Sequence, residues 1–581
     1  MTPGSRTFRF GDFSLVSGER QLLREGVEIV LRPKAFEILL CLLERHGHLI
    51  TKNELLDRVW PETCVSESVL NHCISEIRKA LEDDPRNPRY LKTVPRSGYK
   101  FMHAAEEVIS SVPETRPATK APPAWSIAVL PFANISPDPE QEYFCDGISE
   151  ELINALTRIK DLRVVARTSA FSFKGKDIDI REIGKKLDVG KLLEGSVRKA
   201  GNKLRITVQL VNVSDGYHLW SERYDRELDD VFAIQDEITL AIVDNLKVSL
   251  LGGEKAKITK HHTRDPDAYN LYLKGRHFWS LRTGEGYKKA IEYYQQALEI
   301  DPDYAPAYAG LADTFGFLGF FSFLPPEDAF SKCKETAAKA LAIDNMLVEA
   351  HIALAMASGF YERNWPLADK EFKRAIEINP NNAYAHYSYS LDLTGLGRFD
   401  EADRHIQHAL ALDPLSPIIN TMVAVLFFYK HQYEKAIEAF ERVLELHPTF
   451  GITHMHLGRA LCMKKMYREA VSAAQKGVEF TGGAPLAKCI YGWVLAMSGE
   501  KEKAEQVLFE LKERVKPGFV PAFAVTIIYL GLGDKENAFE WFEKGIEQRD
   551  PALFHIKASP EADILRSDPR YTALLKKMNF A

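Results

Sequence analysis

The chemistry most evident in the chain lies in a short run of polar and cationic side chains near its N-terminal end. Asn71, Ser75 and Arg78 follow one another at spacings of four and three residues, which places them on one face of a helix. His72 and Lys79 flank that face. DNA is recognised in its major groove by hydrogen bonds to base edges, while cations hold the phosphates. This run therefore predicts a helix that reads DNA.

The helix that must position these side chains is predicted over residues 69–81. Its apolar residues recur at i, i+4, i+7 and i+11, which is the pattern of one buried stripe: Leu70, Ile74, Ile77 and Leu81. One side of the helix should pack against a core while the polar side stays in solvent.

A basic hairpin is predicted over residues 90–101, around a turn at Arg96-Ser97-Gly98. Lys92, Arg96 and Lys100 come from this hairpin, and a basic β-turn can contact a minor groove or its phosphates. Residues 70–100 hold seven Lys and Arg against four Asp and Glu, in a chain whose formal net charge is -6. This local excess of positive charge is typical of a nucleic-acid footprint.

An ordinary solvated helix face is the alternative interpretation of these residues. Arg78 and Lys79 could pair with Glu82 or Asp83 rather than contact DNA, and His72 could equally be a surface residue. The combination of helix and hairpin favours DNA binding over this alternative.

The rest of the N-terminal region supplies the scaffold. Short β-like runs occupy 7–31, an apolar helix follows over 31–47, and Thr51 is a plausible N-cap for the next helix. A loop at 61–68 leads to the polar helix. Cys41 and Cys73 are expected to be small buried hydrophobic residues.

Three runs in this region resemble the OmpR/PhoB-type winged helix: RPKAFEILLCLLERHGHLITKNELLDRVW, LNHCISEIRKALEDD and YLKTVPRSGYKF. They are most similar to the branch that contains the cadaverine-operon and invasion-gene regulators, and the resemblance covers residues 7–103. It implies that 69–81 is the recognition helix and that Arg96 to Lys100 form the wing. It also implies an RNA polymerase contact through the loop residues Pro61, Glu62, Thr63, Val65 and Ser66.

The C-terminal half has an internal repeat. Six alanines lie 34 residues apart: Ala368, Ala402, Ala436, Ala470, Ala504 and Ala538. This period resembles the tetratricopeptide repeat over 267–551, in which stacked helix pairs bury each other's faces. Such solenoids usually hold a peptide or a partner protein on the concave surface, and residues 552–581 should form a capping helix.

Between the winged helix and the repeats, residues 125–251 predict an α/β domain with a hairpin at 191–212, flanked by linkers at 104–124 and 252–266. It resembles the TolB-N-terminal-like domain. No phosphate-binding glycine motif occurs in it. Asp146, Glu150 and Glu151 could pair as an acid site, but they lie at a predicted helix start, where acids interact favourably with the helix dipole. We expect no catalytic residue, cofactor or metal.

Composition sets further limits on function. The chain has 581 residues with 45% hydrophobic and 27% charged residues, and no apolar run approaches the length of a membrane helix. The N-terminus lacks a charged start followed by an apolar core, so no secretory signal is expected. Seven scattered cysteines without a CxxC pair suggest a reducing cytoplasm.

The sequence thus predicts a multidomain fold: a winged helix, an α/β middle domain and an all-α tetratricopeptide solenoid. The expected function is a bacterial, cytoplasmic, DNA-binding transcription regulator whose other domains sense a partner or ligand. A homodimer would be needed for tandem half-sites. The alternative is a repeat scaffold that assembles proteins, with the winged helix as a protein-binding module.

Overall fold

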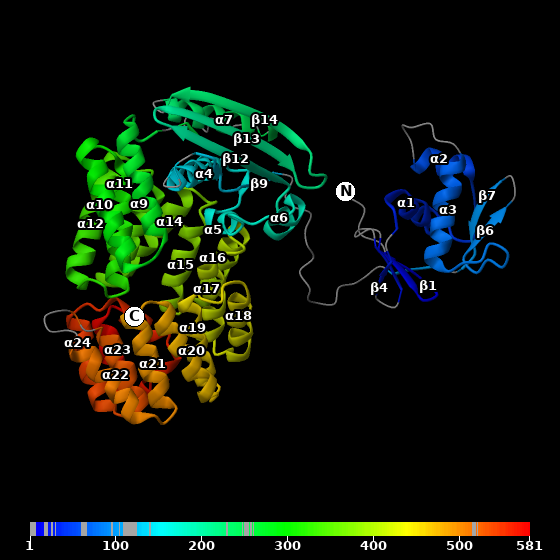
Figure 1. The fold of residues 1–581 in the computed structure, drawn as a ribbon. Coiled ribbons are helices and arrows are strands. Elements are labelled where there is room, and N and C mark those ends of the chain that lie inside the picture. Colours follow the sequence, from blue (N-terminus) through cyan, green and yellow to red (C-terminus); the bar gives the residue numbers. More distant parts are fainter. Residues whose placement is uncertain are drawn as a thin grey trace. The chain divides into compact units, whose positions relative to one another are not determined.

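The structure is a computed structural model of the chain, and its contacts divide into two compact units, residues 1–118 and 119–581. Figure 1 shows the ribbon of both units. The structure describes residues 7–16, 21–24, 27–29, 31–59, 67–94, 97–103, 105–108, 125–136, 138, 141–227, 230–246, 248, 255, 258–259, 261–513, 519 and 521–580.

The first unit begins with an antiparallel sheet of order β4-β3-β2-β1-β8. Its strands are β1 (Thr7–Phe10), β2 (Phe13–Val16), β3 (Gln21–Arg24), β4 (Val27–Ile29) and β8 (Glu106–Val108). β8 lies within the range 104–124 that the sequence assigns to a linker, and its Val108 pairs with Thr7 of β1. The chain therefore returns to the first sheet after the hairpin.

Three helices and a second small sheet complete this unit. They are α1 (Pro33–Glu44), β5 (Leu49–Thr51), α2 (Lys52–Val59), α3 (Glu67–Leu81), β6 (Leu91–Val94) and β7 (Gly98–Phe101). The second sheet has the order β5-β7-β6. This helix and strand order is that of a winged helix, as the sequence predicts.

The predicted stripe of α3 is the side that packs. Leu70, Ile74, Ile77 and Leu81 are all buried in one core with α1. Cys41 and Cys73 are buried there too, which confirms their interpretation as hydrophobic residues. Thr51 is confirmed as an N-cap of α2, since its Oγ1 accepts a hydrogen bond from the backbone of Glu54 at 3.2 Å and Glu54 accepts one from the backbone of Thr51 at 2.8 Å.

The second unit opens with an α/β domain. Its main strands are β9 (Ser126–Val129), β11 (Arg163–Val164), β12 (Lys191–Ala200), β13 (Lys203–Asn212) and β14 (His218–Glu227), in the order β11-β9-β12-β13-β14, and β10 (Ala133–Asn134) pairs with β12. Helices α4 (Glu142–Thr157) and α7 (Val231–Leu246) pack on one face and α6 (Ile180–Leu187) on the other, while the short α5 (Arg167–Phe171) contacts the α4 side through Phe171. β12 and β13 pair over their full length, as predicted.

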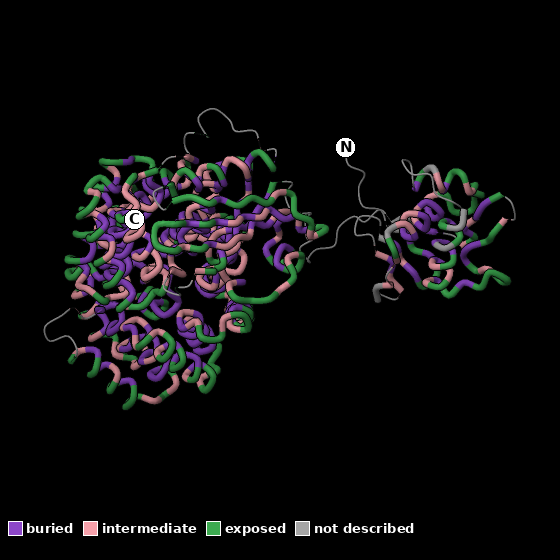
Figure 2. Tube along the Cα trace, turned by 45° about the horizontal axis from the view of Figure 1, so that its top comes forward, coloured by how far each residue is buried: buried purple, intermediate pink, exposed green. Residues whose placement is uncertain are grey.

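The repeats follow as antiparallel helix pairs, and Figure 2 shows buried residues running through their interior. The six alanines spaced 34 residues apart are all fully buried. The helices are α9 (Pro266–Ser280), α10 (Gly284–Ile300), α11 (Ala305–Phe320), α12 (Pro326–Ile343), α13 (Val348–Met356), α14 (Trp365–Ile378), α15 (Ala383–Gly395), α16 (Phe399–Leu412), α17 (Pro417–Tyr429), α18 (Tyr433–Leu446), α19 (Gly451–Met463), α20 (Tyr467–Phe480), α21 (Pro485–Met497), α22 (Lys501–Glu513), α23 (Ala522–Leu532) and α24 (Lys535–Glu547). A π-helical turn, η3 (Ala357–Tyr361), extends α13.

The C-terminal segment does more than cover the last repeat. It comprises two 3-10 turns, η4 (Pro551–Lys557) and η5 (Pro560–Leu565), and the short helix α25 (Pro569–Lys577). η4 contacts helices as early as α11 and α15. The Phe580 ring stacks on Trp365 at a centroid distance of 5.0 Å. The segment thus ties repeats that are far apart in the sequence.

The middle domain and the repeats are joined by hydrogen bonds at the turns between repeat helices. Ala166 donates its N–H to the carbonyl of Leu412 at 2.9 Å, and the backbone N–H of Ser169 donates to Asp413 at 2.9 Å. Asn381 donates its amide to the carbonyl of Ile159 at 3.3 Å. These contacts explain why the two predicted domains form one compact unit.

Candidate nucleic-acid interface

The outward face of α3 carries the predicted hydrogen-bonding residues. Asn71, Ser75 and Lys79 are exposed at intervals of four residues. The Tyr99 hydroxyl, from β7, donates to Oδ1 of Asn71 at 2.8 Å. This bond fixes the Asn71 side chain and leaves its Nδ2 group able to donate to an acceptor on a ligand.

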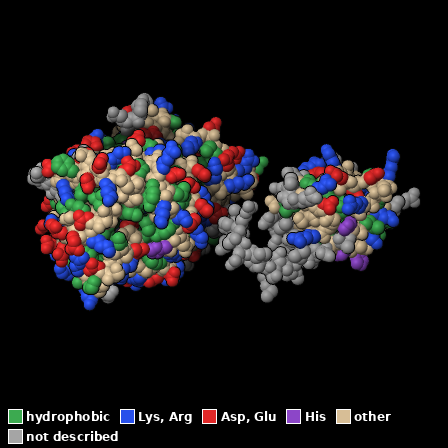
Figure 3. All heavy atoms as spheres, turned by 90° about the horizontal axis from the view of Figure 1, so that it is seen from below, with side chains coloured by type: hydrophobic (Ala, Val, Ile, Leu, Met, Phe, Trp, Pro, Cys, Tyr) green, Lys and Arg blue, Asp and Glu red, His purple; other side chains and the backbone are tan. Residues whose placement is uncertain are grey.

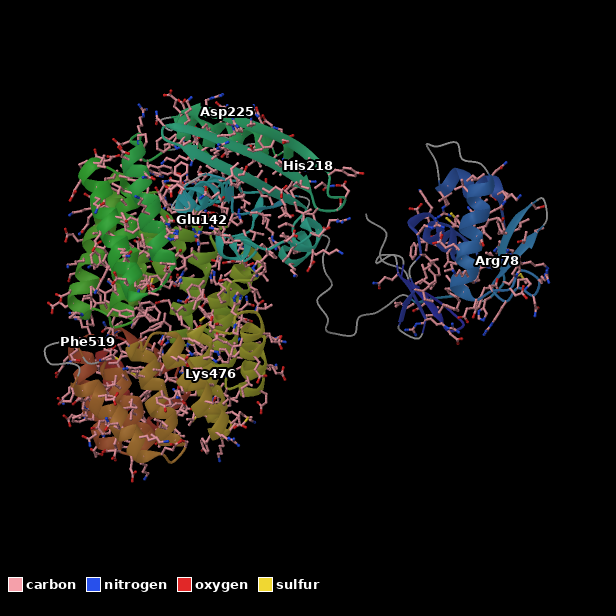
Figure 4. The ribbon with its side chains drawn as sticks, in the orientation of Figure 1. Arg78, Glu142, His218, Asp225, Lys476 and Phe519 are labelled. Carbon is pink, nitrogen blue, oxygen red and sulfur yellow. The ribbon has the colours of Figure 1, made fainter. Side chains whose placement is uncertain are left out.

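Arg78 has a different position from the other predicted residues. Its guanidinium is half-buried and donates to the Leu91 carbonyl at 3.0 Å and to Oγ1 of Thr93 at 2.8 Å. Arg78 therefore connects α3 to β6 through these two hydrogen bonds. Figure 4 labels this side chain between the helix and the hairpin.

The acids next to α3 are engaged within the protein. Glu82 forms an ion pair with Arg24 at 2.9 Å. The Asp83 carboxylate accepts three backbone N–H groups, from residues 89, 90 and 91, at 2.6 to 2.9 Å. Asp84 accepts the backbone N–H of Arg86 at 2.9 Å. Within the described residues, Lys79 has no ion pair or hydrogen bond, so its charge is available to an anion.

The two faces of the hairpin differ. Thr93 and Tyr99 lie opposite each other in the strand pairing and both contact α3. Lys92 and Lys100 are also paired with each other, and alternation along the strands places them on the other face. Lys100 is therefore not brought together with Asn71 and Ser75.

A groove of about 670 Å³ lies between α3 and the hairpin. Its lining is formed by Asn71, Ile74, Ser75, Arg78, Lys79, Glu82, Asp83, Asp84, Pro85, Thr93 and Tyr99. Four of the predicted contact residues on α3, Asn71, Ser75, Arg78 and Lys79, thus share one concave surface with the two hairpin residues that contact them.

Several predicted residues lie outside the described part of the chain. These are Arg96 of the wing, the side chain of His72, and the loop residues Pro61, Glu62, Thr63, Val65 and Ser66. Their roles stay predictions.

The sequence pattern did not reveal the residues that position α3. Arg32, at the start of α1, donates its Nε to Glu76 at 2.7 Å and its backbone N–H to the same carboxylate at 2.8 Å. Thr93 and Tyr99 were also missed as partners of Arg78 and Asn71. No periodicity connects these pairs, because each joins elements that are separated in the sequence.

The acids of α4 are held differently from what the sequence predicts. Asp146 and Glu150 lie inside α4, beyond its first turn, because the helix begins at residue 142. Asp146 pairs with Lys174 at 2.5 Å, and Glu150 pairs with Arg167 at 3.0 Å. Ion pairs with neighbouring elements, rather than the helix dipole, thus compensate these charges.

The remaining described residues include other side chains that could bind a metal or form a disulfide. No group of three metal-ligating side chains occurs among them, and their six cysteines are buried without a disulfide. No helix in this part of the chain is long and apolar enough to cross a membrane. On the face of the second unit seen in Figure 3, Lys and Arg alternate with Asp and Glu, so that face has no field of a single sign.

Comparisons with known families match three parts of the chain. Residues 26–101 match the model "Transcriptional regulatory protein, C terminal", and residues 123–241 match "HilA/YgeH-like transcriptional regulator, second domain". Tetratricopeptide repeat models match 283–319, 390–449, 422–487 and 527–550. The chain thus combines an OmpR/PhoB-type winged helix, a HilA/YgeH-like domain and C-terminal tetratricopeptide repeats.

Individual relatives differ in how much of the chain they share. "Transcriptional regulator HilA" of Salmonella typhimurium is 24% identical over 451 residues, covering 76% of this chain and 77% of the relative. "Transcriptional activator CadC" of Escherichia coli is 29% identical over 204 residues, 30% of this chain and 39% of the relative. "Putative adenylate cyclase 3" of Rhizobium meliloti is 40% identical over 249 residues. That match spans 42% of each chain, so less than half of the cyclase-named relative is represented here.

Solved structures resemble the separate parts. The "DNA binding domain of E. coli CadC" is 30% identical, covers 18% of this chain and all of that chain, and gives a TM-score of 0.17. The thermophilic tetratricopeptide protein TTC0263 of Thermus thermophilus is 22% identical, covers 33% of this chain and 98% of that chain, and gives a TM-score of 0.29.

Proposed function

We propose that this protein regulates transcription by binding promoter DNA through α3 and the β6–β7 hairpin. The observation that carries the proposal is the exposed row of Asn71, Ser75 and Lys79. The neighbouring acids Glu82 and Asp83 already have an ion pair or hydrogen bonds within the protein, so they do not neutralise Lys79. The relatives named as transcriptional regulators support the same function.

The residues would have distinct roles. Asn71, held through its Oδ1, donates from Nδ2 to a base acceptor, and Ser75 makes a second polar contact. Lys79 contacts a phosphate. Arg78 contributes chiefly by keeping the hairpin against α3, and its side chain also lines the groove. We also propose phosphate contacts for His72, Arg96 and Lys100, and a polymerase contact for the loop 61–66.

Anisotropy of a labelled promoter duplex, compared with a scrambled duplex across a salt series, tests this function. In the full chain, Lys79→Ala should weaken both complexes equally and reduce the salt slope by about one. Asn71→Ala should instead reduce the preference for the promoter. Arg9→Ala, an exposed cation on β1, is the matched control and should change neither quantity.

The contrary result would be feeble, equal binding to both duplexes with no effect of Lys79→Ala. That outcome would favour the alternative of a tetratricopeptide scaffold whose winged helix binds protein. The same titration of Lys100→Ala decides whether the other face of the hairpin also contacts DNA.

We further propose that the α/β and repeat domains receive the signal, from a protein, peptide or small ligand. The C-terminal segment already contacts several repeats, so a partner must bind elsewhere on the solenoid or displace this segment. A chain that acts on the chromosome belongs in the cytoplasm.

We also propose that the protein is not an enzyme. The name of the Rhizobium relative defines a direct test, which is to incubate the full chain with ATP and Mg²⁺ or Mn²⁺. We expect no cyclic AMP, and its formation at a rate proportional to protein concentration would contradict the proposal.

A further inference from the structure

Strand β14 forms an edge of the α/β sheet. It is ten residues long and pairs with β13 along its length, and no other described strand pairs with its outer side. Figure 1 shows β14 as the outermost strand of the three long ones. An edge of this length presents unpaired backbone N–H and C=O groups, which can pair with another strand.

The charges on this edge are complementary about Tyr224: residues at equal distances on its two sides carry opposite charges. The central residues are Glu222, Arg223, Tyr224, Asp225 and Arg226. If a second copy of β14 lies antiparallel with Tyr224 opposite Tyr224, Glu222 faces Arg226 and Arg223 faces Asp225. Each of these oppositions occurs twice because of the two-fold symmetry.

Symmetric pairing about any neighbouring residue is unfavourable. A centre at 222, 223, 225 or 226 places a charged residue directly opposite its own copy, and like charges opposite each other destabilise a strand pair. Among the centres from 222 to 226, the charge pattern therefore selects the register centred on Tyr224.

The side chains on both faces have room for this pairing. Tyr224 is buried on the face covered by α7, while Arg223 and Asp225 lie on the other face. Asp225 pairs within the chain with Arg205 at 2.5 Å and Arg223 at 3.0 Å, and Arg226 is 3.9 Å from Glu237. The charged side chains of these ion pairs are 44 to 63% exposed, so they can also contact a second copy.

The strand is regular over residues 222–226, which include the charged side chains. Its register against β13 shifts between Leu210 and Val211, which are paired with Trp220 and His218. A bulge there twists the beginning of β14 but leaves the stretch from 221 to 227 evenly paired. Figure 4 labels His218 and Asp225 toward the two ends of this strand.

We propose that a second copy of this chain pairs antiparallel along β14, centred on Tyr224, and so forms a continuous sheet across a two-fold axis. The dimer would bring two winged helices into one particle, as two DNA half-sites require. The inference does not depend on DNA binding, because the pairing is measured with the protein alone.

Sedimentation velocity of the full chain, from nanomolar to tens of micromolar, is the first test. The mass should rise from monomer to dimer with concentration. Arg226→Glu places a carboxylate opposite Glu222 at two positions and should weaken the dimer by roughly tenfold. The double variant Glu222→Arg with Arg226→Glu restores opposite charges and should recover most of that loss.

The matched control is the exposed pair on α12, Glu335→Lys with Lys339→Glu, which should leave the dimer unchanged. Thermal unfolding of each variant monitors the loss of the Arg226–Glu237 contact within one chain. A register test complements the titration. Under mild oxidation, a mixture of Arg223→Cys and Asp225→Cys chains should form a disulfide between the two variants in preference to one within either variant.

Two results would overturn the proposal. A monomer at every concentration would show that the charged edge serves to block pairing. A dimer that is indifferent to Arg226→Glu and gives no preferential mixed disulfide would place the dimer contact elsewhere on the chain.

Discussion

The buried ion pair between Arg459 of α19 and Glu561 of η5 should hold the C-terminal segment in place. The Nε and a terminal nitrogen of Arg459 donate to the two carboxylate oxygens at 2.6 and 3.0 Å, and the side chains are only 5% and 1% exposed. The guanidinium also lies 4.5 Å from the centre of the Phe428 ring. Burial opposes ionisation of Glu561, but Arg459 and the hydrogen bonds keep its pKa below the ordinary value.

Removing one partner should therefore be costly. Arg459→Met leaves a carboxylate buried without its cation, and breaking such a pair costs about 3–5 kcal/mol. Replacing both residues, Arg459→Met with Glu561→Met, removes both charges together and should cost far less. The exposed pair of Lys544 and Glu540 provides the control, because Lys544→Met should change stability by only about 0.5 kcal/mol.

Urea unfolding gives the free energies, and limited proteolysis reports the C-terminal segment directly. We expect Arg459→Met to expose residues 551–580 to protease before the repeats unfold. If Arg459→Met lowers the free energy of unfolding by less than about 1 kcal/mol and leaves protease resistance unchanged, the reasoning is refuted, because a buried carboxylate without its cation should destabilise the fold by more than that.

Three further predictions concern other parts of the fold. Gly98→Ala should disrupt the hairpin and abolish promoter binding, because an added Cβ would lie 2.0 Å from the Ile50 carbonyl oxygen; intact binding in the anisotropy assay would contradict this. Asp83→Asn weakens the acceptor of three backbone N–H groups, so the free energy of unfolding of the first unit, measured by thermal denaturation, should fall by about 2 kcal/mol. The control variant Asp84→Asn should leave this free energy unchanged. Burial raises the pKa of Asp413 from 3.8 to about 6, so its stabilising contribution is complete below about pH 4 and is lost as the pH rises through 6. Relative to Asp413→Asn, the wild type should thus lose about 3 kcal/mol of unfolding free energy over that interval, and parallel pH profiles would show that this carboxyl does not titrate there.

The winged-helix region shows where prediction from sequence stops. The buried stripe of α3 and the exposure of Asn71 and Ser75 followed from helical spacing alone. The same spacing placed Arg78 with them, yet its guanidinium is bonded to β6. A helical period specifies the direction of a side chain but not which distant strand lies next to it.

The sequence by itself determined the local elements and their repetition. Apolar periodicity marked the packing face of α3, the alternation of β12 and β13 marked a hairpin, and the 34-residue spacing of alanines marked the stacked helices. These features depend on backbone geometry that is the same in every helix or strand. Tertiary structure decided the rest: the Tyr99 bond that orients Asn71, the joint between Ser169 and Asp413, and the free edge of β14. Each of these depends on packing between segments far apart in the chain, and no local period encodes it.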